Sequence, residues 1–241
     1  MTDAALAHAF EASWPPAEAA RAGGFVVGRG AGAGGRVSSA RADGAWSGAD
    51  IDAAEALHAR WNQRPLFRAW DQDHALIGAL EARGYRPEIP TLVLEAPVAR
   101  LTDRPLPRVT TFAIWPPLAI QRQVWAAGSI NPARQAVMAR VVLDKTALLG
   151  RIEDRAAAAG FVARSGDVAM LHALEVLAPF RRKGLAGWML RQAAFWAAEG
   201  GASRLALAVS RANQPAQALY QRHGFAEVAS YAYYARPEAR R

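Results

Sequence analysis

Residues 174–190 read LEVLAPFRRKGLAGWML, a pattern that predicts a strand, a basic turn and then a helix. The turn carries three cations, Arg181, Arg182 and Lys183, which are followed by Gly184. A helix N-terminus presents unpaired N–H groups and a partial positive charge, and both favour anions such as phosphate oxygens. A glycine at this place lets the backbone approach a ligand closely. The stretch therefore predicts a phosphate-bearing ligand held by backbone amides at this turn.

The composition of the chain indicates a globular protein. Its 241 residues suffice for one large domain or two small ones, and 52% of them are hydrophobic. No apolar run reaches the ~18 residues of a membrane span, and the first residues lack the pattern of a secretory signal. We therefore expect a cytoplasmic protein. The chain has no cysteine, which excludes disulfides, a thiolate zinc site and a cysteine nucleophile, and we expect no metal site.

The net charge of +8 is carried almost entirely by arginine, since Lys145 and Lys183 are the only lysines. Such a charge permits binding to anionic ligands or to nucleic acid. No basic tract is interleaved with aromatic residues, however, so the sequence disfavours nucleic acid as a partner.

The rest of the chain alternates between helical and strand patterns. The pattern predicts helices over 3–12, 51–60, 73–83, 118–127, 131–143, 185–199 and 214–223. It predicts strands over 25–29, 36–40, 66–70, 91–95, 109–113, 146–152, 156–164, 168–177, 204–209 and 226–235. A proline-marked connection separates the two halves, so we expect domains at 1–96 and 107–241 with a linker at 97–106.

Gly30, Gly32 and Gly35 form a G-x-G-x-x-G pattern, which in a dinucleotide site opens a helix. The residues that follow, 36–44, read RVSSARADG and do not look helical. We therefore interpret this turn as a flexible connection between two strands of a hairpin.

The second half, about residues 107–241, resembles the GNAT superfamily of acyl-CoA-dependent N-acetyltransferases. The family's phosphate-loop pattern, Arg/Gln-x-x-Gly-x-Gly/Ala, is met by Arg181, Gly184 and Ala186. Downstream, the family's asparagine, Leu-Tyr and Gly-Phe positions are met by Asn213, Leu219-Tyr220 and Gly224-Phe225. The resemblance implies an α/β (α+β) GNAT fold, in which a central mixed, mostly antiparallel sheet is flanked by helices.

The resemblance also implies acetyl-CoA (coenzyme A) as the cofactor. Loop amides would hold its pyrophosphate, and the preceding strand edge would pair with the pantetheine arm. The expected cofactor-binding residues are Leu174, Glu175, Val176, Leu177, Arg181, Arg182, Lys183, Gly184, Leu185, Ala186, Gly187, Asn213 and Tyr220. Asn213 could instead only cap the following helix.

Three residues are candidates for proton transfer. In the family a tyrosine at the Tyr220 position often protonates the leaving thiolate, and a phenol with a pKa of ~10 is a reasonable acid for this step. The alternative for Tyr220 is a core aromatic. Glu175 and His172 are the candidate bases, and the period of a strand places them on opposite faces. Glu175 could instead pair with an arginine and His172 could be a core residue, which leaves water as the base.

The first half compares with the second at a constant offset of 140 residues, Gly84-Tyr85 standing opposite Gly224-Phe225. Leu80 replaces the tyrosine, and Trp46 stands where the loop has Ala186. We interpret residues 1–96 as a degenerate GNAT-like copy that does not bind acetyl-CoA.

The predicted function is transfer of an acetyl group from acetyl-CoA to a primary amine of a small molecule or peptide by direct attack. The alternative is a non-catalytic acyl-CoA-binding or regulatory module on the same fold. The sequence leaves homodimer formation open.

Overall fold

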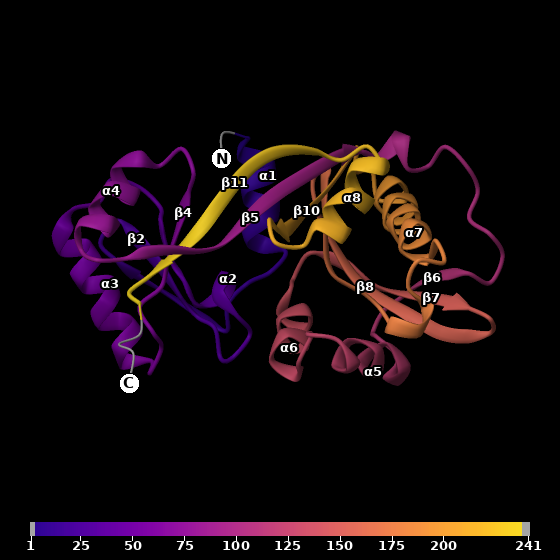
Figure 1. Ribbon diagram of the computed structural model, residues 1–241, viewed down its shortest axis with the longest axis horizontal. Coiled ribbons are helices and arrows are strands. Elements are labelled where there is room, and N and C mark those ends of the chain that lie inside the picture. The colour runs from indigo at the N-terminus through magenta and orange to yellow at the C-terminus, as the bar shows by residue number, and fades with distance from the viewer. Residues whose placement is uncertain (1–2, 238–241) are drawn as a thin grey trace. The chain divides into compact units, whose positions relative to one another are not determined.

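The computed structural model describes residues 3–237 (Figure 1). The chain forms two compact units. Unit 1 contains the described residues up to Trp14, then Val93–Val209 and Asn213–Val228. Unit 2 contains Pro15–Leu92, Ser210–Ala212 and the described residues from Ala229 onward. None of the helices within residues 3–237 is both long and apolar enough to span a bilayer.

This division differs from a cut at the proline-marked connection in two ways. Helix α1 (Ala4–Ala12) belongs to unit 1, because it packs on strands β8 and β9 of that unit. The end of strand β11 (Ala226–Ala235) belongs to unit 2, where Tyr231–Tyr234 pair antiparallel with strand β4 (Phe67–Trp70). Each unit is therefore built from segments of both halves of the sequence.

Unit 1 has a sheet in the order β5-β10-β9-β8-β7-β6. These strands are β5 (Arg86–Pro97), β6 (Thr111–Ile114), β7 (Asp144–Ile152), β8 (Arg155–Ser165), β9 (Val168–Val176) and β10 (Arg204–Ser210). Strands β6 to β9 run antiparallel to their neighbours, whereas β9 and β10 are parallel. The predicted fold class, a mixed and mostly antiparallel sheet flanked by helices, is confirmed.

Helices cover both faces of this sheet. Helices α5 (Ala119–Ala127) and α6 (Pro132–Arg140) lie on one face, where Trp125 is fully buried against Ala159 and Phe161 of β8. Helix α7 (Leu185–Glu199) packs on β7 from the other face (Figure 1). Asn131 caps α6, since its Oδ1 accepts a hydrogen bond from the Arg134 amide at 2.9 Å.

Unit 2 has a sheet in the order β1-β2-β3-β4-β11. Its elements besides β4 and β11 are β1 (Glu18–Ala22), β2 (Phe25–Arg29), α2 (Gly35–Ser38), β3 (Ala40–Ala42), α3 (Gly48–Arg60) and α4 (His74–Ala82). Apolar side chains of α3 and α4 pack against Phe25 and Phe67 from the strands to form its core.

Two predictions in this region are wrong. Residues 36–40 are not a strand: Gly35–Ser38 form a one-turn helix, and the strand is Ala40–Ala42. Helix α3 begins three residues before the predicted start, because Ser47 and Asp50 form a capping box. Ser47 is the cap, and Asp50 is the third residue of the helix.

The structure repeats one local unit at an offset of 140 residues. Helix α4 and helix α8 (Gln214–Arg222) have the same length, and each is followed by a glycine in the left-handed region, Gly84 with φ of 81° and Gly224 with φ of 83°. Strands β5 and β11 then begin two residues after these glycines. We therefore keep the proposal that residues 1–96 derive from a second copy.

Candidate functional site

The site is built where strands β9 and β10 separate. Their parallel ladder joins Val168–Leu171 to Arg204–Leu207 and, within the described residues, goes no further. A register shift between β8 and β9 follows at once, and Ala173 adopts a left-handed φ of 51°. This β-bulge turns β9 away from β10. The edge of β9 that follows the bulge is thus left for another extended chain to pair with.

The bulge changes the expected direction of two candidate bases. Its extra residue brings His172 opposite Phe161 and Glu175 opposite Ala159 on strand β8. Phe161 and Ala159 belong to the same apolar cluster beneath α5. His172 and Glu175 therefore lie on the same face of the sheet, and the prediction of opposite faces is wrong.

The basic turn follows β9 through a short 3-10 helix, η2 (Ala178–Phe180). Arg182 and Gly184 both have a left-handed φ, of 66° and 83°, on either side of Lys183. Turns with left-handed residues aim successive N–H groups into one concavity. Helix α7 then begins at Leu185, as predicted, and no side chain within residues 3–237 caps its first amides. Its first turn also contains no acidic residue.

A cavity of 620 Å³ lies in front of this helix start. Ten of the predicted cofactor-binding residues line it: Leu174, Glu175, Val176, Arg181, Arg182, Gly184, Leu185, Ala186, Gly187 and Asn213. Leu177, Lys183 and Tyr220 are not among its lining residues. Asn213 lines the cavity and also caps helix α8 (Gln214–Arg222), since its side chain accepts a hydrogen bond from the Ala216 amide at 3.3 Å.

Five further residues line the cavity and are not predicted from the sequence: Phe180, Pro215, Ala216, Leu219 and Arg222. Four of them share one face of α8, at the helical spacing that follows from Asn213. This helical spacing from Asn213 could have predicted these four lining residues. Phe180 sits in the short 3-10 turn, whose direction the sequence does not indicate.

Glu175 lines the cavity as a partner of an arginine. Its Oε1 lies 3.0 Å from an Arg181 guanidinium nitrogen, and Arg181 Nε donates to the Val176 carbonyl at 2.8 Å. Only 16% of the Glu175 side chain is exposed. Arg181 thus neutralises the one carboxylate of the cavity and covers part of the strand edge.

We expect Gly128→Ala to disturb this carboxylate. A Cβ on Gly128, which ends helix α5, would stand 2.5 Å from Glu175 Oε2. The Glu175 carboxylate is the end of a flexible side chain and can move away, but this move strains its ion pair with Arg181, so the Tm in a thermal unfolding experiment should fall slightly. In the Gly128→Ala/Glu175→Ala double variant the clash is absent, and the two losses should be clearly less than additive. Additive losses would contradict the contact.

His172 is a core residue. Its ring stacks on Phe161 and its Nε2 lies 2.8 Å from the Ser13 hydroxyl, with 8% of the residue exposed. It does not line the cavity. The structure therefore separates His172 from Glu175 and from the loop.

Tyr220 lies on α8 with its ring 5.6 Å from that of Phe225, and 9% of the residue is exposed. Burial raises the pKa of Tyr220 to about 12. A hydroxyl with this pKa keeps its proton at neutral pH and donates hydrogen bonds. It is a weaker acid than the unperturbed phenol expected from the sequence, because the ordinary value is ~10.

In unit 2 the start of helix α3 contains a carboxylate of its own, that of Asp50. The Asp50 carboxylate accepts a hydrogen bond from the Ser47 amide at 2.8 Å at the start of α3. Asp43, in the preceding turn, pairs with Arg21 at 2.6 Å and Arg41 at 2.9 Å, and these arginines lower its pKa. Trp46 packs against Phe25 with ring centroids 5.9 Å apart. These carboxylates disfavour a phosphate at α3.

Comparison with known proteins gives a family for part of this chain. Residues 118–225 match the family described as Acetyltransferase (GNAT) family. No curated protein sequence matches the chain significantly.

Several solved structures share the fold over most of the chain. A GCN5-related N-acetyltransferase from Kribbella flavida superposes with a TM-score of 0.72 and 18% identity, covering 98% of this chain and 94% of its own. A conserved protein of unknown function from Staphylococcus epidermidis superposes with a TM-score of 0.65 and 12% identity, covering 85% of this chain and 86% of its own. A tandem GNAT protein from the clavulanic acid biosynthesis pathway superposes with a TM-score of 0.61 and 14% identity, covering 84% of this chain and 76% of its own. At these identities the likeness establishes the fold.

Proposed function

The chain belongs to the GNAT acetyltransferase family through its domain at residues 118–225, and from that premise we propose that it transfers an acetyl group from acetyl-CoA to a primary amine of a small molecule or a peptide. The observation that carries the proposal is the start of α7, which has neither a side-chain cap nor an acidic residue and opens onto a 620 Å³ cavity. GNAT acetyltransferases use acetyl-CoA as co-substrate, which supplies the activated acetyl thioester.

The residues around the loop suit the parts of that co-substrate. Amides between Arg182 and Gly187 would donate to a diphosphate, and Gly184, whose left-handed φ suits glycine, has no side chain to block its approach. The edge of β9 beyond Ala173 would pair with an amide-bearing arm such as pantetheine, which at Val176 would replace the hydrogen bond from Arg181 Nε. Leu174 and Val176 line the cavity from this edge.

The proposed chemistry is direct attack of the amine nitrogen on the acetyl carbonyl carbon. The new C–N bond forms as the C–S bond breaks, the amine loses a proton to a base, and the sulfur leaves as a thiolate. Tyr220 would donate its hydroxyl hydrogen to that sulfur. Because burial raises the pKa of Tyr220 to about 12, a strong hydrogen bond is favoured over complete proton transfer to a thiolate, whose conjugate acid resembles a cysteine thiol of pKa ~8.5.

Two groups in the cavity remain as possible bases for the amine proton, Glu175 and a water molecule. His172 is hydrogen-bonded in the core, so we do not assign it. Glu175 lines the cavity but pairs with Arg181, so it accepts a proton only if that pair opens. A water molecule in the cavity is the other route.

One observation favours the non-catalytic alternative, in which the chain binds acyl-CoA without turning it over. Each of the three candidate proton-transfer residues is buried or paired: Tyr220, His172 and Glu175. The test is the release of CoA thiol from acetyl-CoA across a panel of amines, amino acids and peptides. Release above the no-amine rate supports the enzyme. Tight binding with no amine-dependent release supports the alternative.

We expect one equivalent of acetyl-CoA per chain. The Asp50 carboxylate lies in the first turn of α3 and accepts a hydrogen bond from the Ser47 amide, whereas the first turn of α7 has no acidic residue, so we expect a diphosphate only at α7. Isothermal titration calorimetry measures the stoichiometry directly. A second equivalent would contradict the interpretation of residues 1–96 as a copy that has lost its site.

A further inference from the structure

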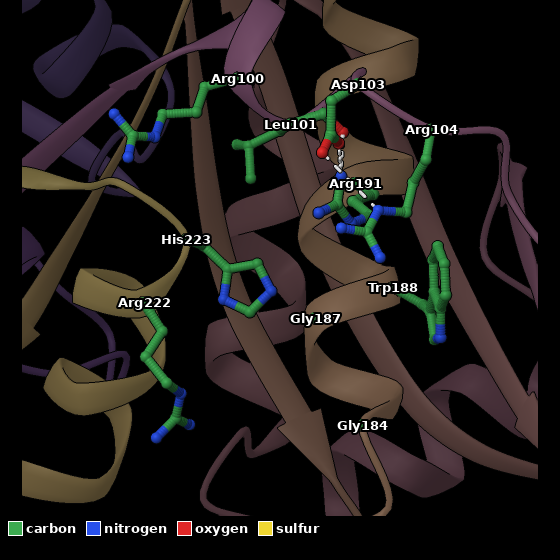
Figure 2. Close-up of a pocket in the computed structure, with 10 residues that line it drawn as sticks. All are labelled: Arg100, Leu101, Asp103, Arg104, Gly184, Gly187, Trp188, Arg191, Arg222 and His223. Atoms are coloured by element: carbon green, nitrogen blue, oxygen red, sulfur yellow. Dashed lines mark hydrogen bonds and ion pairs between the residues drawn. The ribbon is translucent and has the colours of Figure 1, made fainter.

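A second cavity, of 430 Å³, lies on the other side of the α7 start (Figure 2). Gly184, Gly187 and Arg222 line this cavity and the 620 Å³ cavity described above, so the two are adjoining. None of the roles assigned so far uses the other residues of the second cavity. We call it the arginine cavity, after the four arginines that line it, Arg100, Arg104, Arg191 and Arg222.

The charges of the arginine cavity are not balanced. Asp103 is the one carboxylate among its lining residues, against four guanidinium groups. Arg191 forms an ion pair with Asp103, and Arg104 Nε lies 3.6 Å from the same carboxylate. Within residues 3–237, Arg100 and Arg222 form no ion pair. A concave surface with such an excess of one sign concentrates anions.

The cavity is also held in shape. Arg191, from α7, has only 11% of its side chain exposed, and it donates to the Leu101 carbonyl at 3.1 Å. The chain segment that carries Asp103 is thereby fastened to the helix. Figure 2 shows Arg191 and Arg104 beside Asp103, whereas Arg222 and His223 approach from α8.

His223 and Gly187 form the floor between these arginines. His223 Nδ1 donates to the Leu219 carbonyl at 2.8 Å, so its Nε2 is the nitrogen that faces α7. A Cβ on Gly187 would stand 2.7 Å from this Nε2, so the position accepts only glycine without a shift of the ring. The family's loop pattern does not include Gly187. The need for glycine at this position comes from the His223 ring.

The ligand that fits is a phosphomonoester. A phosphomonoester carries close to two negative charges at neutral pH and three acceptor oxygens, which suits several guanidinium donors at once. The adjoining cavity is the one to which we assign the diphosphate of the co-substrate. Coenzyme A carries one phosphomonoester, on the 3′-oxygen of its ribose, on the far side of the diphosphate from the thiol.

We propose that the arginine cavity binds this 3′-phosphate and makes the chain prefer coenzyme A to 3′-dephospho-coenzyme A. The inference rests on the proposed function, since it requires the diphosphate at the α7 start. Arg100 and Arg104 contribute the preference most directly, because they line only the arginine cavity.

The experiment is calorimetric titration of the full chain with coenzyme A and with 3′-dephospho-coenzyme A at one fixed ionic strength. The unmodified chain should bind coenzyme A about tenfold more tightly, as expected for two or three partly exposed charge pairs. In the Arg100→Gln/Arg104→Gln variant this preference should fall to about twofold or less, with the Kd of the dephospho form unchanged. Both arginines are exposed, so the fold is retained, and the Tm checks this.

The matched control is Arg122→Gln, which removes one charge from an exposed position on α5 and should leave both Kd values unchanged. Equal binding of the two ligands by the unmodified chain overturns the inference and leaves the proposed function standing. Binding of neither ligand overturns both.

Inorganic phosphate distinguishes the cofactor's phosphate from a free anion. Phosphate that competes with coenzyme A, but not with the dephospho form, supports the inference. Phosphate that binds through Arg100 and Arg104 while the two ligands bind equally would mean a separate anion site, and would overturn it.

Discussion

Ala186→Asp should abolish acetyl-CoA binding while it raises the free energy of unfolding. Ala186 is the second residue of α7 and lines the cavity in front of the uncapped amides. A carboxylate in the first turn of a helix stabilises the fold by about 0.3–1 kcal/mol through the helix dipole. The same carboxylate repels a diphosphate, and like charges in contact cost several kcal/mol, so the Kd should rise by about 100-fold or more.

The opposite signs of these two effects make the variant informative. A merely damaged fold would lower both stability and binding. Ala186→Asn is the matched control, because it has nearly the same shape as aspartate without the charge, and it should weaken binding far less. Calorimetry gives the Kd and denaturant unfolding gives the stability. Aspartate and asparagine variants with the same Kd would show that the α7 start does not hold an anion.

Unit 2 contains a helix whose first turn already has a carboxylate. Asp50 occupies the first turn of α3 and accepts the Ser47 amide. The turn before it contains Asp43, which forms ion pairs with Arg21 and Arg41. These two arginines are therefore not available to bind a phosphate. A helix start that contains its own carboxylates is locally stabilised and disfavours a bound anion.

Tyr220→Phe is the second large effect that we expect. The ring stays in place against Phe225, so the Tm should change little, but the hydroxyl hydrogen offered to the leaving sulfur is lost. Removal of a group that assists proton transfer costs about 100-fold in kcat. The KM for acetyl-CoA should be unchanged, because this hydrogen bond would strengthen only as negative charge develops on the leaving sulfur. The assay uses the amine that gives the fastest thiol release, and Tyr234→Phe, another buried tyrosine, is the control.

The pH dependence follows from the pKa of Tyr220, which burial raises to about 12. The hydroxyl remains protonated across the neutral and mildly alkaline range, so Tyr220 should cause no loss of rate between about pH 8 and 10. Between its ordinary pKa of ~10 and its raised value, the unfolded chain ionises first. The contribution of Tyr220 to stability is therefore complete below pH ~10 and is lost as the pH rises through 12.

The kinetic result decides the role of the hydroxyl. A Tyr220→Phe variant that keeps the full kcat would show that the Tyr220 hydroxyl does not assist departure of the sulfur.

Much of unit 1 could be predicted from the sequence because its signals are local. The helix at 185–199 is predicted to the residue, from a glycine at each boundary and an apolar pattern between. The loop follows from the same signals, because cations, a glycine and a helix start stand next to each other in the chain. Ten predicted binding residues consequently line one cavity.

The β-bulge at Ala173 could not be predicted in this way. Alanine disfavours a left-handed φ, so nothing in the strand pattern indicates one there. The conformation is set by tertiary packing: the Ala173 carbonyl accepts a hydrogen bond from the buried Trp125 indole at 2.9 Å. A strand without the bulge sends Glu175 to the wrong face, which is why the geometry of the bases was missed.

The composition of the two units was also outside the reach of local patterns. The sequence of a strand gives no information about which strand it pairs with. The pairing of strands 86–97 and 226–235, and so the unit to which each belongs, could not be predicted. The short helix at Gly35–Ser38 has too few residues to show a helical period. Both features depend on contacts between residues far apart in the sequence.

The most direct test of the central claim is a crystal structure of the chain with acetyl-CoA bound. We predict that the diphosphate oxygens lie within hydrogen-bonding distance, about 2.7–3.2 Å, of amides between Arg182 and Gly187. The pantetheine arm should run along the edge of β9 beyond Ala173. A diphosphate seated at the start of α3, or anywhere away from the Arg182–Gly187 amides, would contradict the account.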